Sequence, residues 1–494
     1  RDWRGSLMSC HDPFGREMAR RAHGFRTLDR DLDRITHGEA AQLYAIRPIW
    51  RLGVAVLLLV AGLIVSIGLS GGDPAVAGMG AGLIVAGWLG LSIGANDIAN
   101  SLGPAVGAGA IRLVPGLALV ALAGIAGASL GGEAVTHRLA VGIIAVPNAG
   151  AGMQGQMVML SALIGAAVWI TIATGANLPV STSHSIVGAI AGAGLAAFGV
   201  AAVDWRVMAV IASAWVLTPL VAGVLAGALL ALIHLRVGQA PDRAAAARRW
   251  LPALTGAMIT LFVTNIVSIL PALAMPLPSA LLPGAAVGLA FAWLTRRRVD
   301  HALAMHQEGR PGMKLVLRTP LLMAAVMMAF AHGAGDAGNV AGPLLVILTP
   351  GDQGVLHVPW PVLTGAGVMI ALGALLFGHR LVHMVAGGIT RLNATRAFCI
   401  TLSTALIVLV AAGLGLPVSS THTAIGGVFG VGFVREMLDR RRHRLHGALP
   451  GAEYRRRLLI RRSHVATITV AWVVTVPLTA LIAALVFLLI SRVV

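Results

Sequence analysis

The chain has 494 residues, of which 57% are hydrophobic and only 11% are charged, and its mean hydropathy is +0.85. A soluble globular domain carries about 25% charged residues, so this composition excludes a soluble domain and indicates an integral membrane protein. The formal net charge of +18 comes from arginines that cluster beside apolar segments. Loops of this kind mark the cytoplasmic side of a membrane protein. A nucleic-acid partner, which needs a soluble basic surface, is therefore not expected.

Apolar segments long enough to cross a bilayer follow one another along most of the chain. A membrane helix needs about 20 residues, and long uninterrupted apolar runs exclude the alternating pattern of a β-barrel. The sequence predicts an all-α polytopic membrane protein with roughly 10 to 13 transmembrane helices. Two shorter apolar pieces, 186–199 and 423–434, are predicted as spans or half-spans. The longer predicted spans are 52–69, 78–95, 113–131, 157–174, 207–234, 251–273, 279–295, 319–334, 361–378, 398–413 and 465–490.

Two motifs occur twice in the chain, in the same order and at nearly the same spacing. The sequence GANDIAN at 94–100 recurs as GAGDAGN at 333–339, and LPVSTSHS at 178–185 recurs as LPVSSTHT at 416–423. Chance does not easily produce two ordered repetitions, so the chain contains a duplicated half.

Basic segments give the two copies their orientation. If 1–51 and 296–318 are both cytoplasmic, the helix that leads into Asp97 runs inward, whereas the helix that leads into Asp336 runs outward. This predicts an inverted-repeat secondary transporter, in which broken or re-entrant helices from the two repeats meet near the membrane midplane.

The predicted organisation has two transport repeats flanked by basic segments and additional helices. The segments are a cytoplasmic leader (1–51), an extra N-terminal transmembrane helix (52–77), repeat 1 (78–235), basic loops with a transmembrane hairpin (236–318), repeat 2 (319–434), a basic cytoplasmic loop (435–464) and a C-terminal transmembrane helix (465–494).

Asp97 and Asp336 are candidate functional residues because each follows a long apolar run. A charged side chain inside a membrane costs at least about 2.5 kcal/mol and usually faces a wet cavity and a partner. The alternative is that each aspartate caps a helix that begins at the next residues. A neutral cap would serve there without the charge penalty, so the functional interpretation is favoured.

Hydroxyl residues follow Pro179 and Pro417, which interrupt the preceding helices. A helix that begins at such residues presents free N–H groups and hydroxyl donors, which bind an oxyanion without a lysine. An isolated serine would more often stabilise helix packing in lipid, but two matching runs favour an anion site. The candidate anion ligands are Ser181, Thr182, Ser183, Ser419, Ser420 and Thr421.

Two carboxylates beside anion donors require a cation to neutralise them, and a proton or a sodium ion would do so. Aspartate and asparagine oxygens are hard ligands that suit sodium, and the candidate ligands are Asp97, Asn100, Asp336 and Asn339. Histidine exchanges a proton near neutral pH, so His184, His332 and His422 are candidate proton carriers, although a lone membrane histidine more often packs. No structural metal or other cofactor is expected. An intramembrane hydrolase built on Ser-His pairs and an ion channel are the alternative classes.

At these residues the chain resembles the inorganic phosphate transporter (PiT) family. The resemblance implies a symporter of inorganic phosphate with protons or sodium, and no enzymatic activity. It implies that Asp97, Asn100, Asp336 and Asn339 are substrate or cation ligands, with Asn96 beside them, and that the six hydroxyl residues surround the anion. The expected location is a bacterial-type inner membrane, with multiple passes through the bilayer. Sulfate as substrate and a homo-oligomeric state are left open.

The chain departs from the family pattern at three places. Gly335 stands where the first motif has Asn96, so the repeats do not contribute equally. Some sodium-coupled relatives carry membrane glutamates at positions that align near Gly124 and Thr401, which favours protons as the coupling ion here. The predicted span at 52–69 and its basic leader precede the point where many relatives begin.

Overall fold

The computed structural model describes residues 74–144, 152–176, 178, 180–270, 275–304, 316–349, 358–384, 393–446 and 462–492. The chain divides into two compact units, Arg1–Leu58 and Leu59–Val494, and every described residue belongs to the second. The predicted leader at 1–51 and span at 52–69 lie outside the described residues. Within the described part the elements are helices, with one isolated β-bridge between Ile144 and Val203.

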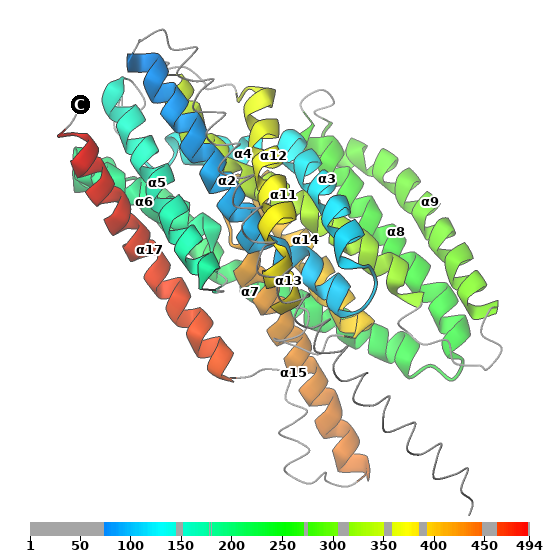
Figure 1. Cartoon of the computed structure of the whole chain (residues 1–494). Coiled ribbons are helices and arrows are strands. Elements are labelled where there is room, and N and C mark those ends of the chain that lie inside the picture. Colours follow the sequence, from blue (N-terminus) through cyan, green and yellow to red (C-terminus); the bar gives the residue numbers. More distant parts are fainter. Residues whose placement is uncertain are drawn as a thin grey trace, which may run out of the picture. The chain divides into compact units, whose positions relative to one another are not determined.

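Ten described helices are long and apolar enough to cross a membrane (Figure 1). Each overlaps a predicted span, which confirms the all-α polytopic fold. They are α2 (Pro74–Gly107), α3 (Leu113–Gly131), α5 (Met153–Gly175), α7 (Trp205–Ile233), α8 (Arg243–Ile269), α9 (Leu277–Ala304), α11 (Arg318–Leu348), α12 (Trp360–Phe377), α14 (Ala394–Gly413) and α17 (Arg462–Ile490).

Two further helices begin at the hydroxyl motifs. The chain leaves α5 at Gly175 and starts α6 (Thr182–Phe198) after a short non-helical stretch. In the same way it leaves α14 at Gly413 and starts α15 (Ser420–His446). Gly415 has a positive φ of 66° in the second break, a conformation that glycine adopts at no steric cost. The predicted broken helices are therefore present in both halves.

Two short helices, α4 (Glu133–Val141) and α13 (His379–Met384), occur at matching places in the two halves and were not expected from hydropathy. Each follows the helix after the first motif, and each packs against the motif helix of the other half: α4 against α11, and α13 against α2. Their charged and polar residues place them below the hydropathy of a membrane span.

Helices of each half pack against helices of the other half. Helix α2 packs against α12 while α11 packs against α3, and α6 packs against α17 while α15 packs against α7. The contacts advance in the same direction along α2 and α12, because Gly90 lies beside Met369 and Ile98 beside Gly378. A short turn joins α2 to α3, which therefore runs the opposite way to α2 and to its own counterpart α12. This geometry confirms the inverted repeat.

Glycines at matching positions allow the exchanged helices to touch backbone to backbone. A Cβ added at Gly94 would overlap the Ile370 carbonyl, and one at Gly333 would overlap the Gly124 carbonyl. Small residues at helix contacts let helices approach closely where lipid offers no hydrophobic driving force. These contacts fix the two motif helices against the neighbouring helices of the opposite repeat.

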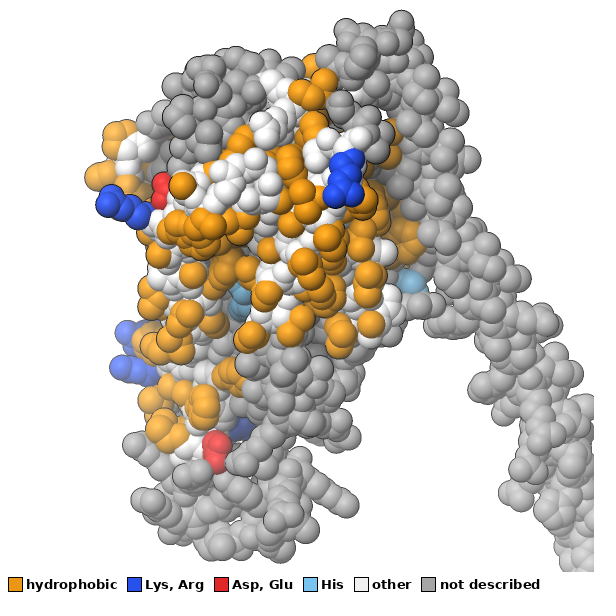
Figure 2. All heavy atoms as spheres, turned by 90° about the vertical axis from the view of Figure 1, so that its left-hand side faces the viewer, with side chains coloured by type: hydrophobic (Ala, Val, Ile, Leu, Met, Phe, Trp, Pro, Cys, Tyr) orange, Lys and Arg blue, Asp and Glu red, His pale blue; other side chains and the backbone are white. Residues whose placement is uncertain are grey.

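Apolar side chains dominate the face drawn in Figure 2, where charged side chains are few. Large apolar residues are exposed on several helices, among them Val224 of α7 at 75% and Leu282 of α9 at 76%. Exposed apolar surface of this extent in a helical bundle matches contact with lipid rather than water.

Candidate binding site

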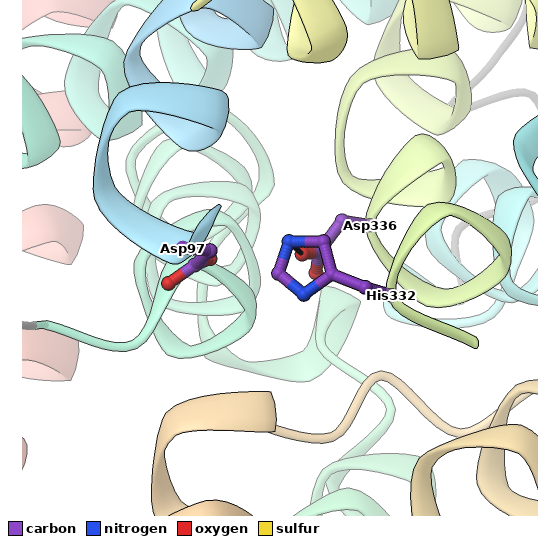
Figure 3. A group of neighbouring side chains, drawn as sticks. All are labelled: Asp97, His332 and Asp336. Atoms are coloured by element: carbon purple, nitrogen blue, oxygen red, sulfur yellow. Dashed lines mark ion pairs between the residues drawn. The ribbon is translucent and has the colours of Figure 1, made fainter. Parts of the chain in front are cut away.

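Asp97 and Asp336 lie inside helices α2 and α11 and are almost fully buried, with 1% and 3% of their surface exposed. Neither is at a helix start, which excludes the disfavoured alternative that these aspartates serve only as helix caps. One ligand atom from each aspartate and one from His332 lie within 4.8 Å of one another (Figure 3). The inverted helices therefore bring the two acids of the duplicated motif into one cluster.

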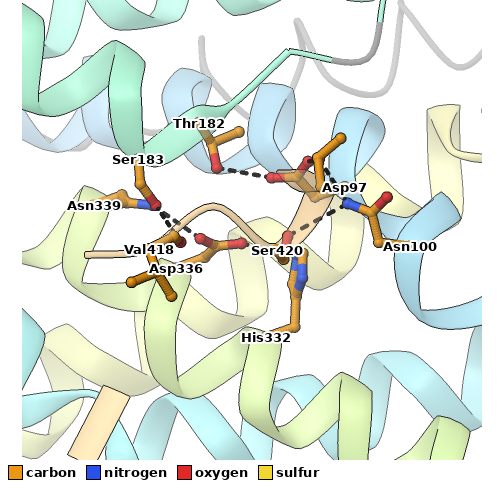
Figure 4. Close-up of polar contacts among 10 residues, drawn as sticks. Asp97, Asn100, Thr182, Ser183, His332, Asp336, Asn339, Val418 and Ser420 are labelled. Carbon is orange, nitrogen blue, oxygen red and sulfur yellow. Dashed lines mark hydrogen bonds and ion pairs between the residues drawn. The ribbon is translucent and has the colours of Figure 1, made fainter. Parts of the chain in front are cut away.

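Asp97 accepts hydrogen bonds from hydroxyls of both broken helices. Thr182 Oγ1 at the start of α6 donates to Asp97 Oδ2 at 2.8 Å (Figure 4). Thr421 Oγ1 at the start of α15 donates to Asp97 Oδ1 at 3.3 Å. One carboxylate is thus tied to a hydroxyl from each repeat.

The Asn96 amide lies between Asp97 and the chain that leads into α6. In the orientation that satisfies both of its ends, Nδ2 donates to Asp97 Oδ1 at 3.1 Å and to the Val180 carbonyl at 3.2 Å, while Oδ1 accepts from Thr174 Oγ1 at 2.9 Å. Asn96 therefore orients the carboxylate and the broken segment together.

Asp336 has different partners. Asn339 Nδ2 donates to its Oδ1 at 2.9 Å, and His332 Nε2 is 2.9 Å from its Oδ2. Gly335, at the position that matches Asn96, has no side-chain amide. A histidine one turn earlier contacts this carboxylate instead.

The two asparagines that end the motifs reach across to the hydroxyls of the opposite repeat. Asn100 Nδ2 donates to Thr421 Oγ1 at 2.8 Å and to Ser420 Oγ at 3.3 Å, and both acceptors lie on α15. Asn339 Nδ2 lies 3.4 Å from Ser183 Oγ on α6. The site is therefore assembled from both repeats at once.

The remaining candidate anion ligands, Ser181, Ser183 and Ser419, form hydrogen bonds with backbone groups. Ser181 Oγ accepts from the backbone N–H of His184 at 3.1 Å, and Ser419 Oγ accepts from that of His422 at 3.2 Å. Both serines are therefore N-caps, the role that serine favours. Ser183 Oγ donates to the Val418 carbonyl at 3.0 Å, so the two broken segments are tied directly to each other.

His184 and His422 lie in the first turns of α6 and α15, where their rings contact each other. The His184 ring contacts His422 with ring centroids 4.4 Å apart and contacts Trp215 with centroids 3.8 Å apart. Trp215 Nε1 donates to the Pro417 carbonyl at 2.8 Å. Of the three candidate proton carriers, His332 contacts a motif carboxylate. Ser183 does not meet the His184 ring nitrogens in a hydrolase-like pair.

Several contributors could not be found from the motifs alone. Thr174, at the end of α5, contacts Asn96 although it lies outside both motifs. The Val418 carbonyl is a partner that no side-chain pattern reveals. Pro179, which the sequence predicts as a helix breaker, lies outside the described residues.

Chemically, the site combines two kinds of group. The first-turn N–H groups of α6 and α15 have no acceptor within their own helices, and hydroxyls surround them, which suits an oxyanion. The buried carboxylates of Asp97 and Asp336 and the carboxamides of Asn100 and Asn339 stand beside these donors and suit a sodium ion or a proton. A tetrahedral oxyanion and a positive charge would stabilise each other here.

Comparison with known proteins identifies the family that shares this architecture. The model of a family described as "Phosphate transporter family" matches residues 93–483, a range that contains both motif pairs. The chain belongs to the phosphate transporter family. A Helicobacter pylori protein named "Putative phosphate permease" is 37% identical over 365 residues, which cover 72% of this chain and 68% of that protein.

Two further members of the phosphate transporter family extend the similarity. "Inorganic phosphate transporter 2-1, chloroplastic" of Arabidopsis thaliana is 31% identical over 426 residues, covering 79% of this chain and 68% of that protein. A solved structure titled "The sodium-dependent phosphate transporter" superposes with a TM-score of 0.74 and 28% identity, covering 84% of this chain and all of that chain. This member is therefore a multi-pass transporter-family protein, and phosphate is the substrate of its family.

Proposed function

We propose that this phosphate transporter family member imports inorganic phosphate together with a cation by alternating access across a cytoplasmic membrane. The observation that carries the proposal is the junction of Asp97 with Thr182 and Thr421. Here a motif carboxylate meets the helix starts of both repeats. A site made of both inverted repeats can open to either side when one repeat moves against the other.

The substrate would lie between the two hydroxyl-bearing helix starts. Thr182, Ser183, Ser420 and Thr421 supply hydroxyls there, and all four are at most 5% exposed. Ser181 and Ser419 would contribute indirectly, because their N-cap hydrogen bonds hold the helix starts in place. Two repeats, 78–235 and 319–434, would enclose the anion, and 465–494 would supply the counterpart of α7.

The paired carboxylates support phosphate over sulfate. Phosphate keeps a proton at neutral pH that it can donate to a buried carboxylate, whereas sulfate has only acceptors. A sulfate ion beside Asp97 and Asp336 would leave carboxylate oxygens facing oxyanion oxygens, which is unfavourable in a desolvated site. Sulfate remains the alternative substrate that the transport experiment includes.

The carboxylates also support cation coupling rather than a channel. An anion that enters beside two buried acids needs a positive charge to enter with it, and a proton or sodium bound among Asp97, Asn100, Asp336 and Asn339 would supply it. We favour the proton, because Gly335 removes one amide ligand from the second repeat and neither Gly124 nor Thr401 is acidic.

Uptake by proteoliposomes tests this function. Labelled phosphate should accumulate when an inward proton gradient is imposed, and unlabelled sulfate should compete weakly. Accumulation driven by a sodium gradient alone would show that sodium, and not the proton, is the coupling ion. Uptake that needs no cation gradient and carries unitary currents would overturn the symporter in favour of a channel.

A further inference from the structure

A small cavity lies beside His332 of the acid cluster, among helices α2, α3, α11 and α12. Its volume is about 30 Å³, room for about two water molecules. Apolar side chains such as Ile98, Val120 and Ile370 and several glycines form most of its wall. Ser101 and His332 are the two polar side chains that line it.

Both of these polar residues have an atom without a hydrogen-bond partner. Ser101 is 1% exposed and His332 is 7% exposed, and neither Ser101 Oγ nor His332 Nδ1 is hydrogen-bonded within the described part of the chain. Buried polar atoms of this kind are normally satisfied by protein or by ordered water. A cavity that is polar at two points and large enough for water is where such water binds.

We propose that water in this cavity bridges Ser101 Oγ to His332 Nδ1, which makes Ser101 a positioning residue for the transport site. The proposal rests on the function proposed above. His332 Nε2 faces Asp336 Oδ2 at 2.9 Å, so this nitrogen is directed at the carboxylate, and the water supplies the partner that Nδ1 lacks among the described residues. The partner of one ring nitrogen sets the state of the other, so the bridging water keeps Nε2 directed at Asp336.

Two unrelated substitutions should remove the same water. Ser101→Ala deletes the hydroxyl that anchors it, and this hydroxyl has no other partner whose loss would unfold the helix. Gly124→Ala adds a methyl group at the cavity wall. Its nearest neighbour would be the Ala329 carbonyl at 3.7 Å, an ordinary contact. The second change removes no polar side-chain atom, so a shared effect points to water rather than to a lost side-chain hydrogen bond.

The matched control is Ser129→Ala on α3. The Ser129 hydroxyl is bonded to the Ile125 carbonyl at 2.8 Å and to Thr364 Oγ1 at 2.9 Å, and it does not line the cavity. This variant loses a helix-packing hydrogen bond but leaves the proposed water in place.

The experiment combines phosphate uptake kinetics in proteoliposomes with the ¹⁵N resonance of His332 Nδ1, assigned by His332→Gln. We expect Ser101→Ala and Gly124→Ala each to raise the KM for phosphate about three- to tenfold. Both should shift the Nδ1 resonance, and Ser129→Ala should change neither quantity. Unchanged KM and resonance in both cavity variants, or an effect of Ser101→Ala that Gly124→Ala does not share, would overturn the water bridge.

The same preparation separates this inference from the proposed function. Asp97→Asn serves as the reference variant that must lose coupled uptake. If Asp97→Asn transports normally, the transport site itself is wrong. If Asp97→Asn is inactive while both cavity variants equal the parent, only the water bridge is refuted.

Discussion

Asp97 and Asp336 occupy matching positions in the two repeats, yet they are held by different groups. Asp97 accepts from two hydroxyls, one on each broken helix, whereas Asp336 is held by Asn339 and His332 on its own helix. The first carboxylate is thus bonded to both segments that would move in alternating access, and the second is bonded within α11. The duplicated motifs therefore place two matching acids in different hydrogen-bonding environments.

Replacing either acid should abolish coupled uptake. In Asp97→Asn and Asp336→Asn the charge that attracts the coupling cation is lost, and an amide N–H₂ replaces an acceptor oxygen. Two hydrogen bonds to a charged group are at stake, so we expect uptake to fall by about 100-fold or more. Initial rates of labelled phosphate uptake measure this effect.

Asp204→Asn is the matched control for these substitutions. Asp204 caps α7 by accepting from the backbone N–H groups of Arg206 and Val207 at 2.9 and 3.0 Å. Asparagine caps a helix about as well as aspartate, so uptake should stay at the parental rate. Full activity in both acid variants would contradict the site.

Asn100→Ala should weaken phosphate binding without destabilising the fold. Asn100 Nδ2 orients the hydroxyls of Ser420 and Thr421 at the start of α15. A neutral hydrogen bond contributes about 0.5–1.5 kcal/mol, which corresponds to a KM increase of up to about tenfold. As a control, Asn393→Ala removes the N-cap of α14 and should lower thermal stability while leaving KM unchanged. The reverse pattern would show that Asn100 has only a structural role.

Ser181→Ala and Ser419→Ala distinguish helix capping from direct anion binding. Each removes an N-cap hydrogen bond from a helix start, a loss of about 1 kcal/mol. We expect lower thermal stability in detergent, measured by intrinsic fluorescence, and partial recovery in Ser181→Thr. A large rise in KM at unchanged stability would instead place these hydroxyls on the anion.

Gly333→Ala should disrupt the bundle, whereas Gly335→Ala should be tolerated. A Cβ at Gly333 would overlap the backbone of Gly124 on α3, but one at Gly335 would have only Val408 near it, at 3.9 Å. Overpacking of a helix contact costs about 1–3 kcal/mol. Yield and melting temperature of the purified variants report the difference, and equal behaviour would refute the backbone contact.

Hydropathy located the membrane helices well but ended the two motif helices too early. The predicted spans 78–95 and 319–334 stop within the motifs, before Asp97 and Asp336, whereas α2 continues to Gly107 and α11 to Leu348. Hydropathy measures whether a residue suits lipid, and the motif residues face protein rather than lipid. Hydropathy therefore predicts a helix end at a place where the helix continues and its polar residues are buried against other helices.

The motif residues were predictable because duplication marked them, but their pairing was not. Sequence separation gives no sign that Asn100 meets Thr421 or that Asp97 meets hydroxyls of both repeats. These contacts depend on the exchange of helices between the halves. The sequence predicts that a hydroxyl caps each helix start but does not show that Ser181 and Ser419 are the caps, since neighbouring hydroxyls of one motif have the same chemistry and differ only in which way they point.

The exchange of helices between repeats has a consequence for biosynthesis. When the ribosome has delivered only the first half, α2 has no α12 to pack against and α6 has no α17. The glycine-lined faces of α2 and α6 and the buried Asp97 lack their partners from the second half until translation is nearly complete. We therefore expect neither half to persist when it is produced alone.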